Sequence, residues 1–199
     1  MNNKYTHPPE GYPAPYYYIG IDNGVTGSIA VVDDVGRLVL YAPTPVEMRQ
    51  SYTKKKDMFN RVRGDIMHAM LAPFAGKSSV VLERPVTGFS FKAIRSGTRS
   101  DEATAIVLEI LGMRYEYVDS GQWQKEMLPH LQAPKKAGKG ANALEKQAIK
   151  TFNDSLKKQT KKLSLEVGRK LFPDREFGRS ATADADAPLL AEWARRNKR

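Results

Sequence analysis

The first half of the chain alternates short apolar runs with turn residues, a pattern typical of β-strands joined by tight connections. Turns are indicated at Asn23-Gly24 and at Asp34-Val35-Gly36. The three runs that they separate are YYYIGID (16–22), GSIAVVDD (27–34) and RLVLYAP (37–43). Because connections this short join antiparallel neighbours, we expect the three runs to form an antiparallel meander.

Two later apolar runs predict a fourth and a fifth strand. SSVVLERP (78–85) is typical of a strand that is buried on both faces, and MRYEYVDS (113–120) follows it. With the helices described next, the order of elements is βββ-α-β-α-β-α-α. This order predicts an α/β fold with a mixed sheet of five strands, three antiparallel and then two parallel, flanked by helices.

Helices are predicted on either side of the fourth strand. Residues 58–74 carry apolar positions at helical spacing and predict a helix that stops near Pro73. A second helix is expected through EATAIVLEILG, with Ser100 or Asp101 as its cap and Gly112 at its end.

The last third of the chain is predicted to be mainly helical. A flexible basic loop, APKKAGKGA (133–141), precedes one long helix over 142–172. A turn at Gly178 and Ser180 then leads to a short last helix at 185–194.

The length of 199 residues fits one good-sized domain. Four of the twelve prolines lie in the first 15 residues, so residues 1–15 are expected to form a flexible N-terminal arm. We expect 16–199 to be a single domain, with a basic loop-helix segment at 133–172.

Composition excludes several classes of site. The chain has no cysteine, which excludes disulfides, thiol nucleophiles and thiolate metal sites, and it has three histidines. Any metal would therefore be a hard cation with oxygen ligands. No apolar stretch approaches the roughly 18 to 20 residues of a membrane span, and the N-terminus has no signal-peptide pattern. We expect a soluble intracellular protein with no membrane partner.

The net charge of +10 is concentrated in the second half of the chain. Residues 1–119 carry 14 Lys and Arg against 13 Asp and Glu, whereas residues 120–199 carry 18 against 9. Within that half, residues 135–170 hold 11 basic and 3 acidic residues. A near-neutral scaffold followed by a basic segment favours a nucleic-acid partner. The alternative is a helix with a solvated basic face.

Asp22 and Glu83 stand at the ends of two predicted strands. Asp22 precedes a turn in which Gly24 and Gly27 are expected to leave the backbone bare for a ligand, although an ordinary hairpin aspartate is the alternative. Glu83 closes the buried fourth strand, at the edge where α/β sheets bind ligands, and burial there requires a cation or a metal. The alternative for Glu83 is a structural ion pair with Arg84.

Asp184 and Asp186 stand at the start of the last predicted helix, in SATADADAPLLAEWARR. Because proline is tolerated only in the first turn of a helix, Pro188 places the helix start close to both aspartates. There they can converge, whereas residues two apart inside a helix point away from each other. The alternative is that one of them is the N-cap.

The four carboxylates have one joint use. Carboxylates from two strand ends and one helix start can bind two divalent cations about 3.5–4 Å apart. One cation activates water and the other stabilises the leaving oxygen of a phosphodiester. The metals also relieve the mutual repulsion of the carboxylates.

Five stretches carry a resemblance to a known family. They are IGIDNGVTGSIAVV, VVLERP, DSGQWQKEML, KKQTKKLSLEVGRKLFP and ADAPLLAEWARR, which together cover most of residues 16–196. These stretches resemble the RuvC-like Holliday junction resolvases of the ribonuclease H-like fold, and most closely the phage-encoded and chloroplast members.

The resemblance implies a homodimeric endodeoxyribonuclease that resolves four-way DNA junctions by paired symmetric cuts, with two Mg²⁺ or Mn²⁺ ions per active site. Three of the family's metal-binding acids fall on Asp22, Glu83 and Asp186, and Asp184 is the carboxylate nearest to the fourth position. Asp22 is expected to bridge both metals, Glu83 and Asp186 to complete one each, and Asp184 to assist. An enzyme of this kind acts in DNA recombination and repair in the cytoplasm, that of the host cell if it is phage-encoded.

Affinity for such a junction is expected to come mainly from Lys and Arg contacts to phosphates. Phe89 and Phe91 are candidates to stack on an unpaired base at the junction centre, with core packing as the alternative. Lys125 is a candidate at the scissile phosphate, with a solvated lysine as the alternative. The other candidate DNA contacts are Arg95, Arg99, Lys135, Lys136, Lys139, Lys157, Lys158, Lys161 and Lys162.

Three rival functions fit parts of the sequence. A ribonuclease H-like nuclease that acts on RNA or on an RNA–DNA hybrid keeps the fold and changes the substrate. An ATP-binding protein of the actin and sugar-kinase kind shares the D-x-G-x-T-G hairpin but needs two such domains. A non-catalytic junction-binding module would retain carboxylates that repel phosphate unless they hold cations.

Overall fold

The chain divides into two compact units. One combines Met1–Ser120 with Asp186–Arg199, and the other is Gly121–Ala185. The computed structural model describes residues 16–50, 58–85, 91–129, 131–138, 140, 142–177 and 185–197. Within these ranges no helix has the length and apolar character needed to cross a membrane. The expected N-terminal arm, residues 1–15, lies outside the described residues.

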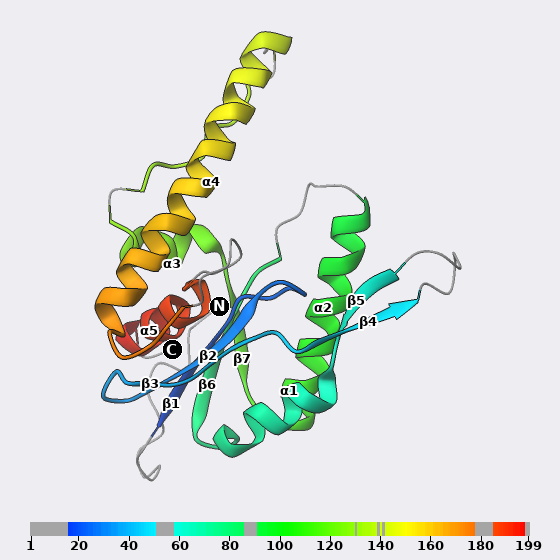
Figure 1. Cartoon of the computed structure of the whole chain (residues 1–199), viewed down its shortest axis with the longest axis vertical. Helices are drawn as coiled ribbons and strands as arrows, with labels where there is room; N and C mark the ends of the chain where they lie inside the picture. The colour runs from blue at the N-terminus through cyan, green and yellow to red at the C-terminus, as the bar shows by residue number, and fades with distance from the viewer. Residues whose placement is uncertain are drawn as a thin grey trace. The chain divides into compact units, whose positions relative to one another are not determined.

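A five-stranded mixed sheet forms the centre of the first unit (Figure 1). Its strands are β1 (Tyr17–Ile21), β2 (Ser28–Asp33), β3 (Leu38–Pro43), β6 (Ser78–Glu83) and β7 (Tyr115–Val118). They lie in the order β3-β2-β1-β6-β7. Strands β3, β2 and β1 pair antiparallel, and β1, β6 and β7 pair parallel. The predicted α/β fold, with three antiparallel and then two parallel strands, is confirmed.

Alternate residues of β1 face two different layers. Ile19 and Ile21 belong to the main hydrophobic core, together with Met67 of α1 (Gly64–Leu71) and Leu108 of α2 (Phe91–Ile110). The opposite face of β1 is covered by α5 (Asp186–Asn197), which also contacts β2. Figure 1 shows α5 on one side of the sheet and α1 and α2 on the other. Burial on both faces explains why the central strands are continuous apolar runs.

Gly20 is the point at which α5 approaches β1. A Cβ atom at Gly20 would lie 2.5 Å from the backbone N of Ala191 and still closer to the backbone O of Ala187. The two alanines are one turn apart, and both are fully buried. Glycine in the strand and alanine in the helix therefore allow the two backbones into direct contact, which fixes the first turn of α5 on β1. Pro188 lies in that first turn, as predicted.

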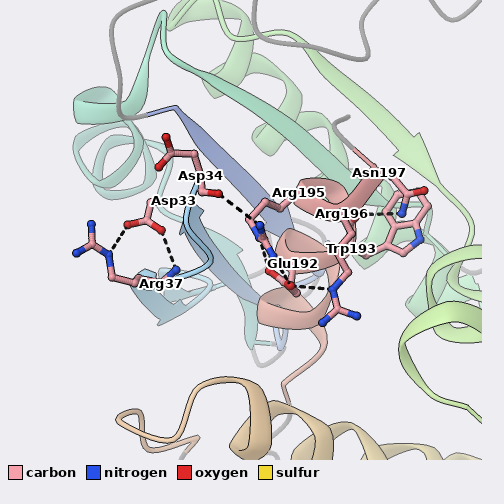
Figure 2. Close-up of polar contacts among 8 residues, drawn as sticks. All are labelled: Asp33, Asp34, Arg37, Glu192, Trp193, Arg195, Arg196 and Asn197. Atoms are coloured by element: carbon pink, nitrogen blue, oxygen red, sulfur yellow. Dashed lines mark hydrogen bonds and ion pairs between the residues drawn. The ribbon is translucent and has the colours of Figure 1, made fainter.

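A buried carboxylate holds the last turn of α5. Glu192 is 4% exposed and accepts hydrogen bonds from Arg195 Nε at 2.7 Å and from Arg196 Nε at 2.8 Å. Arg195 Nη1 also donates to the backbone O of Asp34, in the turn between β2 and β3. Figure 2 shows this chain of contacts. Burial raises the pKa of Glu192, but the hydrogen bonds and charges of the two arginines outweigh it and hold the pKa below its ordinary value.

The helix predicted over residues 58–74 is wrong in its first part. Met58–Val62 is a strand, β5, that pairs antiparallel with β4 (Val46–Gln50) in a separate two-stranded sheet. The helix itself starts at Gly64, and the 3₁₀ turn η1 (Ala72–Phe74) follows it. The apolar residues Met58 and Val62 are four apart, a spacing that fits both a helix and an alternating strand. The cross-strand partner in β4 decides between them.

Helix α2 starts at Phe91, earlier than the predicted cap, so that both Ser100 and Asp101 lie inside it. These residue types favour helix caps because their side chains compete for backbone groups. Here Asp101 instead bonds side chains of other elements, and Ser100 is buried. The end of the element is as predicted, since Gly112 follows it with a φ of 64°.

The second unit is built on α4 (Ala143–Leu171), in agreement with the helix predicted over 142–172. Asn142 and Glu145 form a capping box at its start. The shorter α3 (Ser120–Met127) precedes it. The described part of the expected flexible loop has no regular secondary structure, but Lys135 is bonded to α4: its backbone N and O each pair with the side-chain amide of Asn153. The expected turn at 178–180 lies outside the described residues.

We predict that Gly20→Ala lowers the free energy of unfolding by about 1–3 kcal/mol, because the new methyl group meets backbone atoms that cannot rotate away. Urea denaturation measures the change. The matched control is Gly97→Ala in α2, where a Cβ meets nothing within 4 Å and helix propensity should add up to about 1 kcal/mol. Equal effects of the two substitutions would contradict close packing at Gly20.

We predict that Glu192→Gln costs about 1–3 kcal/mol of stability at pH 7, since it weakens charged hydrogen bonds at a buried carboxylate. Because the folded-state pKa of Glu192 lies below its ordinary value of 4.5, its contribution is complete above pH 4.5 and disappears as the pH falls further. The gap between wild type and variant should therefore close in acid. Denaturation curves from pH 7 to pH 3 measure it, with the exposed Glu102→Gln as the control that shows little change at any pH.

Candidate active site

Asp22 and Glu83 lie side by side at one edge of the sheet. Strands β1 and β6 run parallel, with Ile21 opposite Leu82 as the last pair. Asp22 is the next residue after β1, and Glu83 is the last residue of β6. Both are half-buried. The sequence predicted that each carboxylate stands at a strand end. The parallel pairing adds that the two strands are neighbours, which brings together carboxylates from distant parts of the chain.

The turn between β1 and β2 closes tightly around Asp22. Its backbone N donates to Ser28 O at 3.0 Å, and Gly27 N donates to Gly24 O at 3.1 Å. A Cβ at Gly27 would collide with the backbone O of Asp22 and lie 3.2 Å from its Cγ. Gly27 is thus packed against Asp22, and the prediction that it leaves the backbone bare for a ligand is wrong. Gly24 does leave open space, because a Cβ there meets nothing within 4 Å.

Asp186 lies near the same end of β1, although it belongs to the last helix of the chain. It is the first residue of α5, next to Ala187, whose backbone O lies against Gly20. Gly20 is two residues before Asp22. Asp186 is half-buried. The fourth predicted carboxylate, Asp184, lies outside the described residues.

Asp22, Glu83 and Asp186 offer oxygen ligands, the donor chemistry that a hard cation such as Mg²⁺ requires. Their positions differ from a finished metal site, however. Among the described residues, no three acidic or histidine side chains are close enough together to hold a metal ion. The structure thus places these carboxylates at one corner of the sheet without arranging them as a coordination sphere.

The sequence offered Arg84 as an alternative ion-pair partner of Glu83, but Arg84 pairs with a different acid. Its Nε donates to Asp119 Oδ1 at 2.9 Å, just after β7. Its guanidinium lies 5.6 Å from the ring centroid of Tyr117. Both ion-pair partners are more than half exposed, so the pair contributes little to stability.

A polar network beside this corner was not predicted from the sequence. Asp101 Oδ1 accepts hydrogen bonds from Asn23 Nδ2 and from the Tyr117 hydroxyl, and Thr104 Oγ1 lies 3.4 Å from Asn23 Oδ1. Burial, and secondly the hydrogen bond to Asp101, raises the pKa of Tyr117 above its ordinary value. Asn23 and Asp101 are 78 positions apart in the chain, and no local pattern links them.

The candidate DNA contacts in the first unit lie mainly on α2. Arg99 is exposed, and its guanidinium lies 5.0 Å from the ring centroid of Phe59 in β5. Arg95 is half-buried, and Phe91 is the first residue of the helix. Phe89 lies outside the described residues.

In the second unit the candidate lysines are exposed on α3, on α4 and in the segment before it. Lys135 has its ammonium 4.3 Å from the ring centroid of Phe152. Lys162 is 4.0 Å from Glu166. Lys139 lies outside the described residues. The other exposed lysines of the predicted set are Lys125, Lys136, Lys157, Lys158 and Lys161.

Two solved structures of one protein are similar to the chain. The structure of T. thermophilus RuvC in complex with a Holliday junction substrate matches with a TM-score of 0.54 and 15% sequence identity, over 92% of this chain and 97% of that chain. A further Thermus thermophilus RuvC structure has a TM-score of 0.46 and 14% identity, over 89% of this chain and 94% of that chain.

No protein-family model matches the chain, and no curated protein matches it. At 15% identity the first structural match establishes the fold, which agrees with the strand order described above. The chain therefore has the fold of the RuvC-like Holliday junction resolvases.

Proposed function

We propose that the protein is a metal-dependent endonuclease that resolves four-way DNA junctions. The observation that carries the proposal is the placement of Asp22 and Glu83 at neighbouring ends of β1 and β6, with Asp186 at the start of α5 beside them. These positions occur on a RuvC-like fold, and the matching structure of T. thermophilus RuvC contains a Holliday junction substrate.

The same carboxylates are the proposed metal ligands. Asp22, Glu83 and Asp186, with Asp184 as a fourth, would hold two Mg²⁺ ions, for which Mn²⁺ can substitute. Bound there, the metals supply an activated water and stabilise the leaving oxygen of the phosphodiester. The products would carry 5′-phosphate and 3′-hydroxyl ends. Symmetric cuts in two strands require two sites, so we also propose a homodimer.

The basic surface of α4 supports a polyanionic partner. Lys157 and Lys161 form one i,i+4 pair on the helix surface, and Lys158 and Lys162 form the next. Like charges at this spacing destabilise a helix, by about 0.2–0.5 kcal/mol per pair. Glu166 is 4.0 Å from Lys162, which partly offsets this repulsion. Phosphate groups would relieve the rest and gain affinity by the release of counterions.

We predict that Asp22→Asn abolishes junction cleavage in Mg²⁺ while junction binding survives. The loss should exceed about 100-fold, the upper end of the effect of removing only a supporting residue of a metal site. Gel assays with a synthetic four-way junction measure cleavage and binding on the same samples. The matched control is Asp34→Asn, an exposed carboxylate in the turn between β2 and β3, which should cut like wild type.

Three outcomes would count against the proposal. An Asp22→Asn variant that still cuts the junction removes Asp22 from the catalytic site. Faster cleavage of an RNA–DNA hybrid than of the junction favours the ribonuclease H-like alternative. Junction binding by wild type with no products in Mg²⁺ or Mn²⁺ favours a non-catalytic binding module.

We predict that replacing Lys157, Lys158, Lys161 and Lys162 by alanine makes junction binding less sensitive to salt. Each lost phosphate contact should reduce the slope of log K against log salt by about 0.9, to a total of about 3.6 for four contacts. Binding titrations at several salt concentrations between about 50 and 200 mM, a range over which affinity for DNA falls strongly, measure the slope. Arginine at all four positions keeps the charge and should keep the slope. If the alanine variant retains the wild-type slope, this face of α4 does not contact DNA.

A further inference from the structure

Asp101 lies at the centre of a polar network that joins three elements of the first unit. Its Oδ1 accepts a hydrogen bond from Asn23 Nδ2 at 2.5 Å and another from the Tyr117 hydroxyl at 2.8 Å. Asn23 belongs to the turn between β1 and β2, Asp101 to the middle of α2, and Tyr117 to β7. One carboxylate oxygen therefore connects a turn, a helix and a strand.

The side-chain amide of Asn23 is held by α2 at both ends. Its Nδ2 donates to Asp101, and its Oδ1 is 3.4 Å from the hydroxyl of Thr104. Asp101 and Thr104 are three residues apart and so lie on the same face of the helix. Thr104 is 1% exposed, and its hydroxyl also lies 2.9 Å from Ser100 O, which makes the bond to Asp101 the stronger anchor for Asn23.

The network reaches the immediate neighbours of both strand-end carboxylates. Asn23 directly follows Asp22, so one peptide bond transmits any movement of Asn23 to Asp22. Tyr117 is paired with Leu82, the residue before Glu83. Asp101 thus connects two residues to the same helix: Asn23, which follows Asp22, and Tyr117, which pairs with the residue before Glu83.

The two hydrogen bonds to Asp101 Oδ1 are short, at 2.5 Å from Asn23 Nδ2 and 2.8 Å from the Tyr117 hydroxyl. Burial, and secondly Asp101 itself, raises the pKa of Tyr117 above its ordinary value of 10.0, so that the phenol remains a proton donor at neutral pH. Both donors bind the same oxygen, Oδ1, so protein side chains already engage it.

We propose that Asp101 is a positioning residue, which acts through Asn23 to fix the orientation of Asp22 and does not itself contact DNA or metal. The inference rests on the proposed nuclease function, in which Asp22 is a catalytic carboxylate. It assigns a catalytic consequence to a residue of α2 that the sequence marked only as a candidate helix cap.

The test compares Asp101→Ala with Asp101→Asn, which retains a carbonyl oxygen as an acceptor, and with Tyr117→Phe, which removes one donor. Amide hydrogen exchange of Asp22 and Gly27 reports on the turn, because their N–H groups bond Ser28 O and Gly24 O within it. Single-turnover cleavage and junction Kd are measured separately. The matched controls are Glu102→Ala, the exposed neighbour on α2, and Tyr115→Phe, the other tyrosine of β7.

We expect Asp101→Ala to speed exchange of the two turn amides about tenfold, the loss of one hydrogen bond to a charged group. Its cleavage rate should fall about 10- to 100-fold, while junction Kd changes less than about twofold. Asp101→Asn should recover part of the rate, Tyr117→Phe should lose less than Asp101→Ala, and both controls should behave like wild type. Urea denaturation gives the folded fraction to which each rate is normalised.

Each other outcome overturns a defined part of the proposal. Unchanged exchange of the turn amides in Asp101→Ala overturns the positioning role, whatever the activity. Faster exchange with a wild-type cleavage rate per folded molecule overturns the link to Asp22. If wild type itself does not cut junctions, the proposed function fails, and the exchange measurement still decides whether Asp101 holds the turn.

Discussion

The parallel pairing of β1 with β6 is the constraint on which the candidate site depends. Parallel neighbours end at the same edge of a sheet, so Asp22 and Glu83 meet; an antiparallel pair would place Glu83 at the opposite edge. The hydrophobic core protects this register. A slip of one residue would turn Ile19 and Ile21 out of the core and onto the other face. The burial that stabilises the sheet therefore also determines which carboxylates are neighbours.

Helix α5 is fixed to this sheet by two different means at its two ends. At the start, Gly20 lets the helix backbone lie directly on β1, where a side chain would force it away. At the end, Glu192 bonds Arg195, which reaches the turn between β2 and β3. Close packing sets the distance of the helix from the sheet. The hydrogen bond from Arg195 to Asp34 O joins its last turn to the turn between β2 and β3. These two contacts together determine where Asp186, the first residue of α5, lies.

The five strands and the mixed character of the sheet were predictable because they follow from local signals, namely turn residues between apolar runs. The same signals placed Asp22 and Glu83 at strand ends, whereas the pairing of β1 with β6 depends on strands distant in the chain. The errors arose where residues distant in the chain determine the local structure. The spacing of Met58 and Val62 fits a helix and a strand, and the pairing with β4 selects the strand. Asp101 is of a residue type that favours helix caps, but its side chain binds Asn23 and Tyr117 instead. Gly27 was assigned to ligand access, yet its close packing on Asp22 depends on the exact path of the turn. The metal and DNA assignments stay predictions, since carboxylate and lysine positions alone do not show what they bind.

The pairing of Asn153 with Lys135 has a consequence for the energetics of association. The side-chain amide of Asn153 accepts a hydrogen bond from Lys135 N and donates one to Lys135 O, the pattern of a backbone pair between two strands. It thereby joins the segment before α4 to the helix. The backbone of Lys135 is consequently held against the helix that carries Lys157, Lys158, Lys161 and Lys162. A chain that must order its charges on contact loses conformational entropy with every side chain and loop that it immobilises. For the DNA ligand proposed above, the backbone part of that loss at Lys135 would precede binding, because folding has already ordered it.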